Sequence, residues 1–207
     1  AARIRRLDEQ AQITVFERSG YISYANCGLP YYIGDVITDA EELTLQTPES
    51  FYSRFRVDMR VHHEVTAIHP EKKTVSVKNL KTGEEFEESY DKLILSPGAK
   101  PTQPRFSGTE LDKVFTLRTV EDTLRIKKYI NQNHPKSVVL AGGGFIGLEL
   151  AENLRELGMD VTIVQNGKQL MNLFDHDMAS FIHNEMRKHG VKLALGHTVE
   201  GFEDRDG

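Results

Sequence analysis

The feature that most constrains the fold of this 207-residue chain is a run of glycines between a strand pattern and a helix pattern. Residues 137–141 predict a short buried strand, and residues 145–157 predict a helix. Between them, Gly142, Gly144 and Gly147 have the spacing G-x-G-x-x-G. In this context the glycines allow a tight turn, the close approach of a pyrophosphate and close helix packing. The sequence therefore predicts a dinucleotide-binding βαβ unit, with a glycine-rich turn that binds nothing as the plainer alternative.

The strand after this helix is expected over residues 159–165 and ends at Gln165, where dinucleotide-binding units commonly carry an acid. A carboxylate there would bind the ribose 2′-hydroxyl and repel a 2′-phosphate, so its absence leaves NADPH open beside NADH. Gln165 can still form a hydrogen bond, and Lys168 is either a phosphate contact or an ordinary solvated lysine. Glu149, in the first turn of the helix, can reach a nicotinamide carboxamide or simply complement the helix dipole.

The other elements predicted from the sequence alternate between helices and strands, which indicates an α/β chain. A strand over residues 12–17 ends at Glu17 and follows a helix near residues 3–7, the order found in the second half of a nucleotide-binding unit. A helix over residues 119–131 carries an apolar stripe that Lys127 and Lys128 leave incomplete. Further elements are a helix from residue 47, strands within 58–68, a hairpin at 73–90, a buried strand at 92–96, a helix from Asp175 to Gly190 and a strand at 191–195.

The helix after Asp175 is expected to bury one apolar face, made by Met178, Phe181, Ile182 and Met186. It also carries His176, His183 and His189, and none of these is spaced i, i+4 as a pair of metal ligands would be. All eight histidines are interpreted as surface residues. No metal site is predicted.

Cys27 is the only cysteine, so it cannot form a disulfide within the chain. Pro30 suits the first turn of a helix, which places Cys27 at or just before a helix N-terminus. Free N–H groups and the helix dipole would favour a thiolate there. Taken alone, a lone cysteine is more often an inert small apolar residue. A redox role would need a second sulfur or an oxygen from outside the chain.

The composition is that of an ordinary soluble protein, with 39% hydrophobic and 28% charged residues. A net charge of −5 argues against a nucleic-acid surface. No apolar run approaches the roughly 18 residues that span a bilayer, and no signal peptide is visible. A single cysteine suits a reducing cytoplasm. The composition shifts near residues 104–110, which predicts two domains, residues 1–106 with the cysteine and residues 107–207. The chain starts without Met inside a helix pattern and is interpreted as a fragment.

Three segments together resemble the single-cysteine pyridine nucleotide–disulfide oxidoreductases, and in particular the branch of coenzyme A-disulfide reductases with their NADH-oxidase-like and persulfide-reductase relatives. The similarity spans essentially all 207 residues. The segments are Ser-Tyr-Ala-Asn-Cys-Gly-Leu-Pro-Tyr-Tyr-Ile-Gly at 23–34, Tyr-Asp-Lys-Leu-Ile-Leu-Ser-Pro-Gly-Ala at 90–99 and Gly-Gly-Gly-Phe-Ile-Gly-Leu-Glu at 142–149.

The resemblance implies two Rossmann-like domains of the three-layer ββα type, for FAD and for NAD(P), followed in the family by a dimerisation domain. Both nucleotide domains would be truncated here and the dimerisation domain absent. The glycine-rich FAD turn and the family's second flavin-contacting segment are missing from the sequence. The expectation is that this fragment holds FAD poorly, whereas residues from about 106 onward bind a nicotinamide dinucleotide more readily.

The function implied by the resemblance is an enzyme that uses FAD and NAD(P)H to reduce CoA disulfide, or a related disulfide or persulfide, through Cys27. The parent protein would be a cytoplasmic homodimer without nucleic-acid or membrane partners. One alternative is an NADH oxidase or peroxidase in which Cys27 passes through sulfenic acid. Another is a nucleotide-binding redox sensor that is not an enzyme.

The resemblance also implies roles for particular residues. Cys27 would be the catalytic thiolate facing the flavin, Ser23 and Asn26 would contact the pantetheine arm of the substrate, and Arg6 would lie near the CoA nucleotide. Glu17 would bind the FAD adenosine ribose. Ser-Pro replaces the family's commoner Ala-Thr where the chain passes the FAD, and Phe145 would gate the nicotinamide side. The cofactor-binding residues are Glu17, Arg18, Ser96, Pro97, Gly98, Gly142, Gly144, Phe145, Ile146, Gly147, Glu149 and Gln165.

Overall fold

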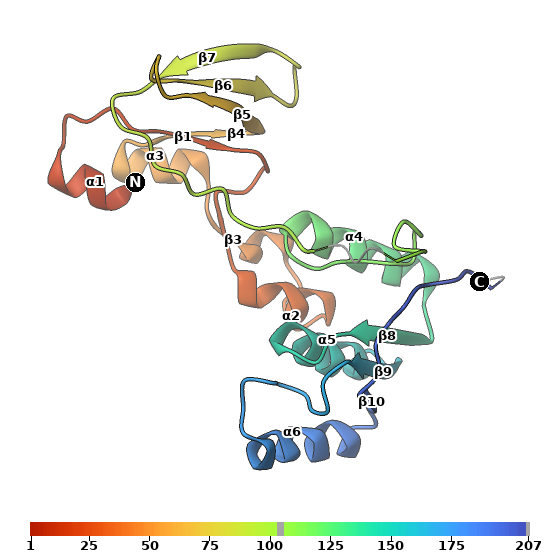
Figure 1. Cartoon of the computed structure of the whole chain (residues 1–207). Helices are drawn as coiled ribbons and strands as arrows, with labels where there is room; N and C mark the ends of the chain where they lie inside the picture. The colour runs from red at the N-terminus through yellow and green to blue at the C-terminus, as the bar shows by residue number, and fades with distance from the viewer. Residues whose placement is uncertain (103–105, 206–207) are drawn as a thin grey trace. The chain divides into compact units, whose positions relative to one another are not determined.

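The computed structural model describes residues 1–102 and 106–205 (Figure 1). The chain divides into two compact units, one of residues 1–25 and 44–99 and one of residues 26–43 and 100–207. The cysteine segment therefore packs with the second half of the chain. The predicted boundary near 104–110 falls partly on residues 103–105, which lie outside the described residues. The division into an FAD domain and an NAD(P) domain near residue 106 remains a prediction.

The first unit contains a small parallel sheet in which β1 (Thr14–Glu17) pairs with β4 (Asp58–Val61). Helix α1 (Ala2–Leu7) precedes β1, and helix α3 (Pro48–Phe55) precedes β4. Thr47 forms a capping box with the first turn of α3, which explains why this helix begins where the sequence predicts it. The parallel pair places Glu17 at the carboxyl end of its strand.

A three-stranded antiparallel sheet completes this part of the unit, with the order β5 (His63–His69), β6 (Thr74–Asn79) and β7 (Glu85–Ser89). In the central strand Val75 and Val77 are buried, and Thr74, Ser76 and Lys78 beside them are less so, which is the period of two expected for a sheet with one buried face. The predicted hairpin at 73–90 is present as β6 and β7.

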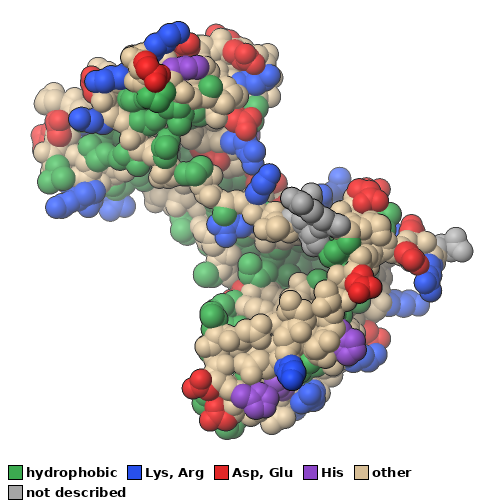
Figure 2. Space-filling model, viewed as in Figure 1, with side chains coloured by type: hydrophobic (Ala, Val, Ile, Leu, Met, Phe, Trp, Pro, Cys, Tyr) green, Lys and Arg blue, Asp and Glu red, His purple; other side chains and the backbone are tan. Residues whose placement is uncertain are grey.

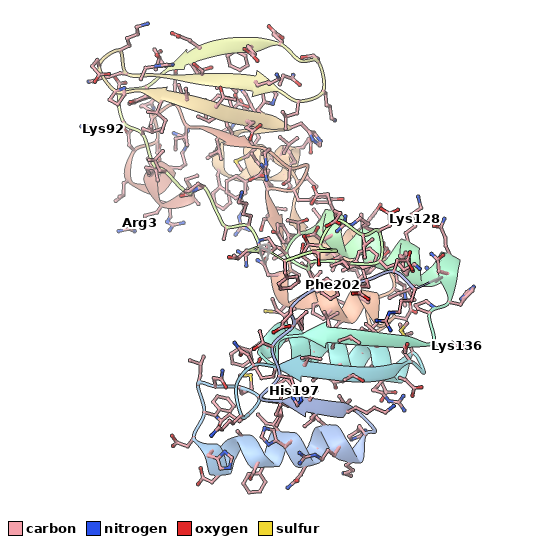
Figure 3. All side chains as sticks on the ribbon, turned by 45° about the vertical axis from the view of Figure 1, so that its right-hand side comes forward. Arg3, Lys92, Lys128, Lys136, His197 and Phe202 are labelled. Atoms are coloured by element: carbon pink, nitrogen blue, oxygen red, sulfur yellow. The ribbon has the colours of Figure 1, made fainter. Side chains whose placement is uncertain are left out.

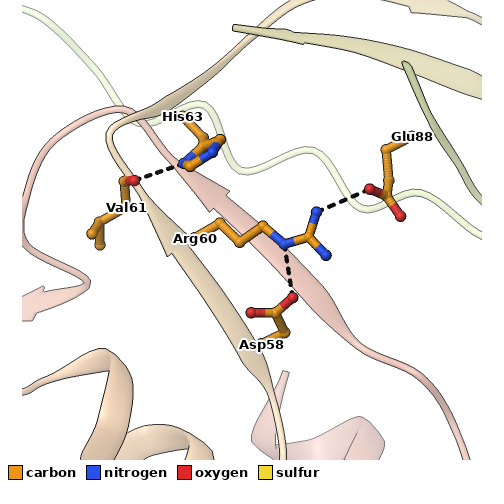
Figure 4. Close-up of polar contacts among 5 residues, drawn as sticks. All are labelled: Asp58, Arg60, Val61, His63 and Glu88. Carbon is orange, nitrogen blue, oxygen red and sulfur yellow. Dashed lines mark hydrogen bonds and ion pairs between the residues drawn. The ribbon is translucent and has the colours of Figure 1, made fainter. Parts of the chain in front are cut away.

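Arg60 connects the β1–β4 sheet of the first unit to the β5–β6–β7 sheet (Figure 4). Its Nε donates to Asp58 Oδ2 at 2.8 Å, and its Nη1 donates to Glu88 Oε2 at 3.0 Å on β7. The guanidinium also lies 5.5 Å from the ring centroid of Phe16, which packs against His63. A planar cation with several donors suits this position, because it satisfies two carboxylates and an aromatic face at once.

Residues 92–96 do not form the buried strand that their sequence predicts. They have no strand assignment, and Ile94 and Leu95 remain 68% and 65% exposed. A strand is stable only when a neighbouring strand accepts its backbone hydrogen bonds. Within the described residues no strand pairs with this run, so its apolar composition is not sufficient to form a strand.

The second unit is built on a parallel sheet with the strand order β10 (Lys192–Leu195), β9 (Asp160–Gln165), β8 (Ser137–Ala141). Helix α5 (Phe145–Glu156) connects β8 to β9, and helix α6 (His176–Lys188) connects β9 to β10. In chain order this is the arrangement 3-2-1, one half of a doubly wound nucleotide-binding fold. Together with the sheets of the first unit it confirms the predicted α/β class.

The segment 26–43 packs into this second unit. It consists of the 3-10 turn η1 (Asn26–Gly28), helix α2 (Leu29–Ile33) and the 3-10 turn η2 (Ala40–Leu43), and α2 contacts both α5 and α4 (Val120–Asn133). Ile33 is completely buried in the core of the unit. The other fully or nearly buried members of this core are Ala151, Leu154, Met159, Val161, Ile163, Leu170 and Val191.

The buried face of α6 differs from the predicted one. Met178 and Phe181 are 56% and 68% exposed, whereas His183, predicted at the surface, is only 6% exposed. The stripe turned toward the unit is Ala179, Ile182, His183 and Met186. These positions follow the i, i+3, i+4, i+7 pattern once a neutral histidine is counted as part of the apolar face.

Charged side chains of both signs are mixed over the face of the molecule that Figure 2 shows. They do not gather there into one basic patch, the feature that would mark a nucleic-acid surface. This distribution agrees with the net charge of −5.

Candidate functional site

The glycine turn lies between a strand and a helix, as predicted. β8 ends at Ala141 and α5 begins at Phe145. Gly142 has φ of +114°, a conformation that residues with a side chain rarely adopt. A Cβ on Gly147 would overlap the carbonyl oxygen of Gly142. The first and last glycines of the motif are therefore required by the backbone itself, since they let α5 start directly beside the end of the strand.

The middle of the turn fits a dinucleotide pyrophosphate. Gly144 is the N-cap of α5, no side chain caps this end of the helix, and the space that a Cβ on Gly144 would take is open. The first-turn N–H groups of a twelve-residue helix have no partners within the helix, and the helix dipole is positive there. Such an end can hold a phosphate by backbone donors alone.

Gln165 braces this turn from the neighbouring strand. Its side chain is buried, and its Oε1 accepts a hydrogen bond from Gly143 N at 3.2 Å. Met171 N donates to Gly143 O at 2.8 Å, and the Leu170 side chain fills the space where a Cβ on Gly143 would lie. Because a backbone N–H can only donate, the amide oxygen of Gln165 must face the turn, and its NH₂ group is the end left for a ligand.

His183 supports the same turn indirectly, through Leu170. Its Nε2 accepts a hydrogen bond from Leu170 N at 2.9 Å, and Leu170 packs against Gly143. Burial lowers the pKa of His183 from its usual value near 6.5, and the charges of Arg187 and His176 lower it further. The acceptor role requires an unprotonated Nε2, so the neutral imidazole is the form that this contact needs.

The other predicted nucleotide contacts lie around the turn. Phe145 and Ile146 are exposed at the start of α5, and the Phe145 ring contacts that of Phe174 edge-on, with centroids 6.5 Å apart. Glu149 is half-buried on the second turn of the helix, and Lys168 is exposed beyond the end of β9. The structure thus brings the predicted residues of the NAD(P) site together at one end of the sheet.

Cys27 is exposed in the turn η1, directly before α2. Pro30 stands in the first turn of α2, as its fixed φ favours, and is buried. Asn26 shares the turn with Cys27 and is also exposed. A thiol in this position is accessible to a small disulfide from solvent.

Tyr31 shows what surrounds the cysteine. Its pKa is raised mainly by the charge of Glu152, then by burial, by Glu149 and by Cys27. Cys27 and the two glutamates of α5 are therefore close enough to Tyr31 to act on its hydroxyl. The Cys27 thiol and helix α5 therefore both lie near Tyr31.

The residues proposed for FAD lie in the first unit, as do Arg6 and Ser23 of those proposed for CoA, whereas Asn26 belongs to the second unit with Cys27. Glu17 ends β1 with one oxygen, Oε1, accepting from Ser19 N at 2.7 Å, so its second oxygen can accept a ribose hydroxyl and fits the adenosine end of FAD. Arg18 forms an exposed ion pair with Glu64 at 3.6 Å. Arg6 is exposed on α1, and Ser23 is half-buried in β2 (Ser23–Tyr24).

Ser96, Pro97 and Gly98 are exposed and lie outside helices and strands. Gly98 has φ of +72° with open space around it, so the chain can approach a ligand closely there. The described part of the first unit, residues 1–25 and 44–99, has no strand–glycine turn–helix element like that of β8 and α5. The fit to FAD therefore rests on Glu17 and this passage alone.

Two residues that organise the site were not singled out from the sequence. Lys127 is buried and binds the end of α2, and Asn153 on α5 packs against Gly34. The available signal for Lys127 was its place at helical spacing within the apolar stripe of α4. Asn153 offers no comparable signal, because a polar residue on an amphipathic helix is ordinary.

Among residues 1–102 and 106–205, no group of three or more His, Cys, Asp or Glu side chains could hold a metal ion. In the same part of the chain no helix combines the length and the apolar character needed to cross a membrane.

Comparisons with known proteins point to one family. The family model "Pyridine nucleotide-disulphide oxidoreductase" matches residues 1–207. A coenzyme A disulfide reductase of Staphylococcus aureus (strain MRSA252) is 42% identical over 206 residues, which cover all of this chain and 46% of that protein. The chain thus spans about half the length of this curated relative.

Solved structures give the same result. Reduced CoADR-RHD from Bacillus anthracis is 49% identical, with a TM-score of 0.94 over 98% of this chain and 37% of that one. The water-forming NADH oxidase from Lactobacillus brevis, bound to NADH, is 34% identical, with a TM-score of 0.90 over 98% of this chain and 45% of that one. The match over the whole chain, with a single cysteine and a glycine turn of the expected geometry, places this chain in the pyridine nucleotide-disulphide oxidoreductase family.

Proposed function

We propose that the protein containing this chain uses NAD(P)H and FAD to reduce CoA disulfide, or a related small disulfide or persulfide, through Cys27. The observation that carries the proposal is the position of an exposed lone thiol in the same compact unit as a dinucleotide-type glycine turn. The similarity to coenzyme A disulfide reductase supports the choice of substrate.

The chain's own residues suggest how each part of the reaction is served. The open turn at Gly144 and the first turn of α5 bind the pyrophosphate of the nicotinamide nucleotide, and Glu17 binds the adenosine ribose of FAD. Bound FAD would supply the relay of two electrons from the nicotinamide to sulfur. Cys27 supplies the nucleophile, and Asn26 and Ser23 orient the thiol substrate.

The sulfur chemistry balances with a single cysteine. The Cys27 thiolate attacks one sulfur of the substrate disulfide RSSR, forms the mixed disulfide Cys27–S–S–R, and releases RS⁻, which takes up a proton. Two electrons and a further proton then cleave the mixed disulfide, which restores the thiolate and releases the second RSH. Overall, RSSR, NAD(P)H and H⁺ give two RSH and NAD(P)⁺.

Substitution of Cys27 tests this proposal. Cys27→Ser should lower the kcat for CoA-disulfide reduction by about 10³-fold or more, because an alcohol is a poor nucleophile toward sulfur. The measurement is NAD(P)H oxidation at 340 nm by the flavin-loaded enzyme. Ser23→Ala serves as a milder comparison, and circular dichroism confirms that both variants fold. Wild-type turnover in the Cys27→Ser enzyme would remove the cysteine from the mechanism.

A second candidate is an NADH oxidase or peroxidase, favoured by the structural likeness to the Lactobacillus brevis oxidase. In that case Cys27 would take one oxygen from peroxide to give sulfenic acid and water, and two electrons with two protons would return the thiol and a second water. Parallel assays with CoA disulfide, O₂ and hydrogen peroxide distinguish the two. A kcat/KM higher for peroxide or O₂ than for CoA disulfide would favour the oxidase.

The whole protein is further proposed to act as a cytoplasmic homodimer. The support is the single unpaired cysteine, which suits a reducing compartment, together with the family resemblance. Sedimentation of the full-length protein measures the oligomeric state directly.

A further inference from the structure

Lys127 is the only lysine that is buried among residues 1–102 and 106–205. It lies on α4, and its Nζ donates to the carbonyl oxygen of Ile33 at 2.9 Å and pairs with Asp35 Oδ2 at 2.6 Å. The Asp35 side chain is half-exposed, so the carboxylate keeps part of its hydration while the ammonium does not. Buried lysines are rare unless paired, and here two acceptors 92 and 94 residues away in the chain take the place of water.

The acceptors of Lys127 lie at the end of the helix that follows Cys27. Helix α2 is only five residues long, ends at Ile33, and starts two residues after the cysteine. Ile33 is its last carbonyl before the chain turns, an end where a cation is favourable. Asp35 adopts φ of +63°, a conformation uncommon for residues with a side chain, and in it the carboxylate meets Lys127.

A second contact fixes the same point against α5. Gly34 lies so close to Asn153 that a Cβ on Gly34 would overlap the Asn153 side chain. Asn153 is itself held, because its Nδ2 donates to the carbonyl of Glu149 at 2.7 Å. The end of α2 is therefore attached on one side to α4 and on the other to the helix that begins at the glycine turn.

We propose that Lys127 is a positioning residue for Cys27, acting through the carbonyl of Ile33 and the carboxylate of Asp35. A helix of five residues is not stable by itself, so the orientation of the turn before it depends on how its far end is fixed. Lys127 fixes that end to the nucleotide-binding unit and so sets the thiol relative to the start of α5. The catalytic consequence rests on the proposed role of Cys27, whereas the structural consequence can be measured independently.

The first measurement is amide hydrogen exchange in the full-length protein that contains this chain, comparing Lys127→Met with Lys128→Met. Lys128 is the exposed neighbour of Lys127 on α4 (Figure 3). The reporters are the amides of Gly34 and Val36, which donate to Pro30 O and Tyr31 O. In Lys127→Met they should exchange about tenfold faster, with amides of β9 unchanged. Equal exchange in the two variants overturns the proposal.

The second measurement separates positioning of the thiol from mere stability. In the flavin-loaded enzyme, Lys127→Met should lower kcat for disulfide reduction about tenfold while the KM for NAD(P)H stays within about twofold. Lys128→Met should change neither. Faster exchange with an unchanged kcat would show that the contacts of Lys127 stabilise the end of α2 but do not position Cys27. That result also overturns the proposal.

Two milder variants keep the test open if Lys127→Met does not fold. Lys127→Arg retains the cation and should recover most of the kcat, and Asp35→Asn should have a smaller effect than Lys127→Met because the Ile33 carbonyl still accepts. The reverse order would contradict the proposed geometry. Failure of the proposed function is recognised separately, because it would appear as activity in Cys27→Ser with the exchange results intact.

Discussion

At the residue scale, the amide of Gln165 has a fixed direction because of its partner. Gly143 N–H is a donor, so it selects the oxygen of the amide and leaves the NH₂ group for a ligand, which in the proposed NAD(P) site would be the adenosine ribose. An NH₂ group can donate equally to a 2′-hydroxyl and to a 2′-phosphate. We therefore propose that the protein has a weak nucleotide preference or one that leans toward NADPH.

Gln165→Glu tests this reading of the nucleotide preference. A carboxylate can replace the amide oxygen at Gly143, but its second oxygen would repel a 2′-phosphate. We expect KM for NADPH to rise roughly tenfold and KM for NADH to change little. Steady-state kinetics with both nucleotides give the answer, and Gln132→Glu, on the exposed face of α4, controls for the added charge. A wild-type enzyme that already prefers NADH a hundredfold would refute the proposed preference.

His183 predicts a pH dependence of stability. Burial lowers its pKa in the folded protein, so the unfolded chain binds the proton first as the pH falls below about 6.5. The contribution of the neutral histidine is complete above that pH and is lost progressively as the pH drops toward the folded pKa. Thermal unfolding of the wild type should show this loss. His183→Gln keeps an acceptor for Leu170 N without titrating and should flatten the curve, whereas His197→Gln, on an exposed histidine, should not.

At the element scale, the β8–turn–α5 unit was predictable because local patterns determine it. A β-branched strand, three glycines at fixed spacing and an amphipathic helix agree with one another, and no distant partner is needed to recognise them. The strand at 92–96 failed for the opposite reason, since its pattern is local but its stability depends on a neighbouring strand. The predicted face of α6 was right for Ile182 and Met186 and wrong for Met178 and Phe181, because His183 was counted as polar.

Two glycines of the turn should respond to alanine in different ways. In Gly147→Ala the new Cβ meets the carbonyl of Gly142, a backbone atom that cannot easily move, so we expect the free energy of unfolding to fall by about 1–3 kcal/mol. Gly144→Ala adds its Cβ in open space and should leave stability unchanged, but the methyl group would occupy room needed by a pyrophosphate. Thermal unfolding and NADPH titration, measured on both variants, separate the effects. Equal stability of the two variants would contradict the packing described here.

At the scale of the whole molecule, the sequence predicts the local nucleotide-binding patterns better than it predicts which segments pack together into one unit. Both strand-end positions, Glu17 and Gln165, could be identified from local sequence. The ion pair between Lys127 and Asp35 could not be identified, because a single sequence gives no sign that a lysine on one helix neutralises an aspartate 92 residues earlier. This pair is one of the contacts between the cysteine segment and the second unit, beside the burial of Ile33 in its core.

The path of residues 26–43 has a consequence for dissecting the protein into pieces. The segment leaves the first unit after β2 and returns through β3 (Thr44–Gln46), and these two short strands pair antiparallel, so exit and return are neighbours. One cut near residue 106 would separate Ile33 from the core that it fills. A nucleotide-binding piece expressed alone would have to include residues 26–43, with a linker that joins residue 43 to residue 100. In the remaining piece, a two-residue turn could join Ala25 to Thr44.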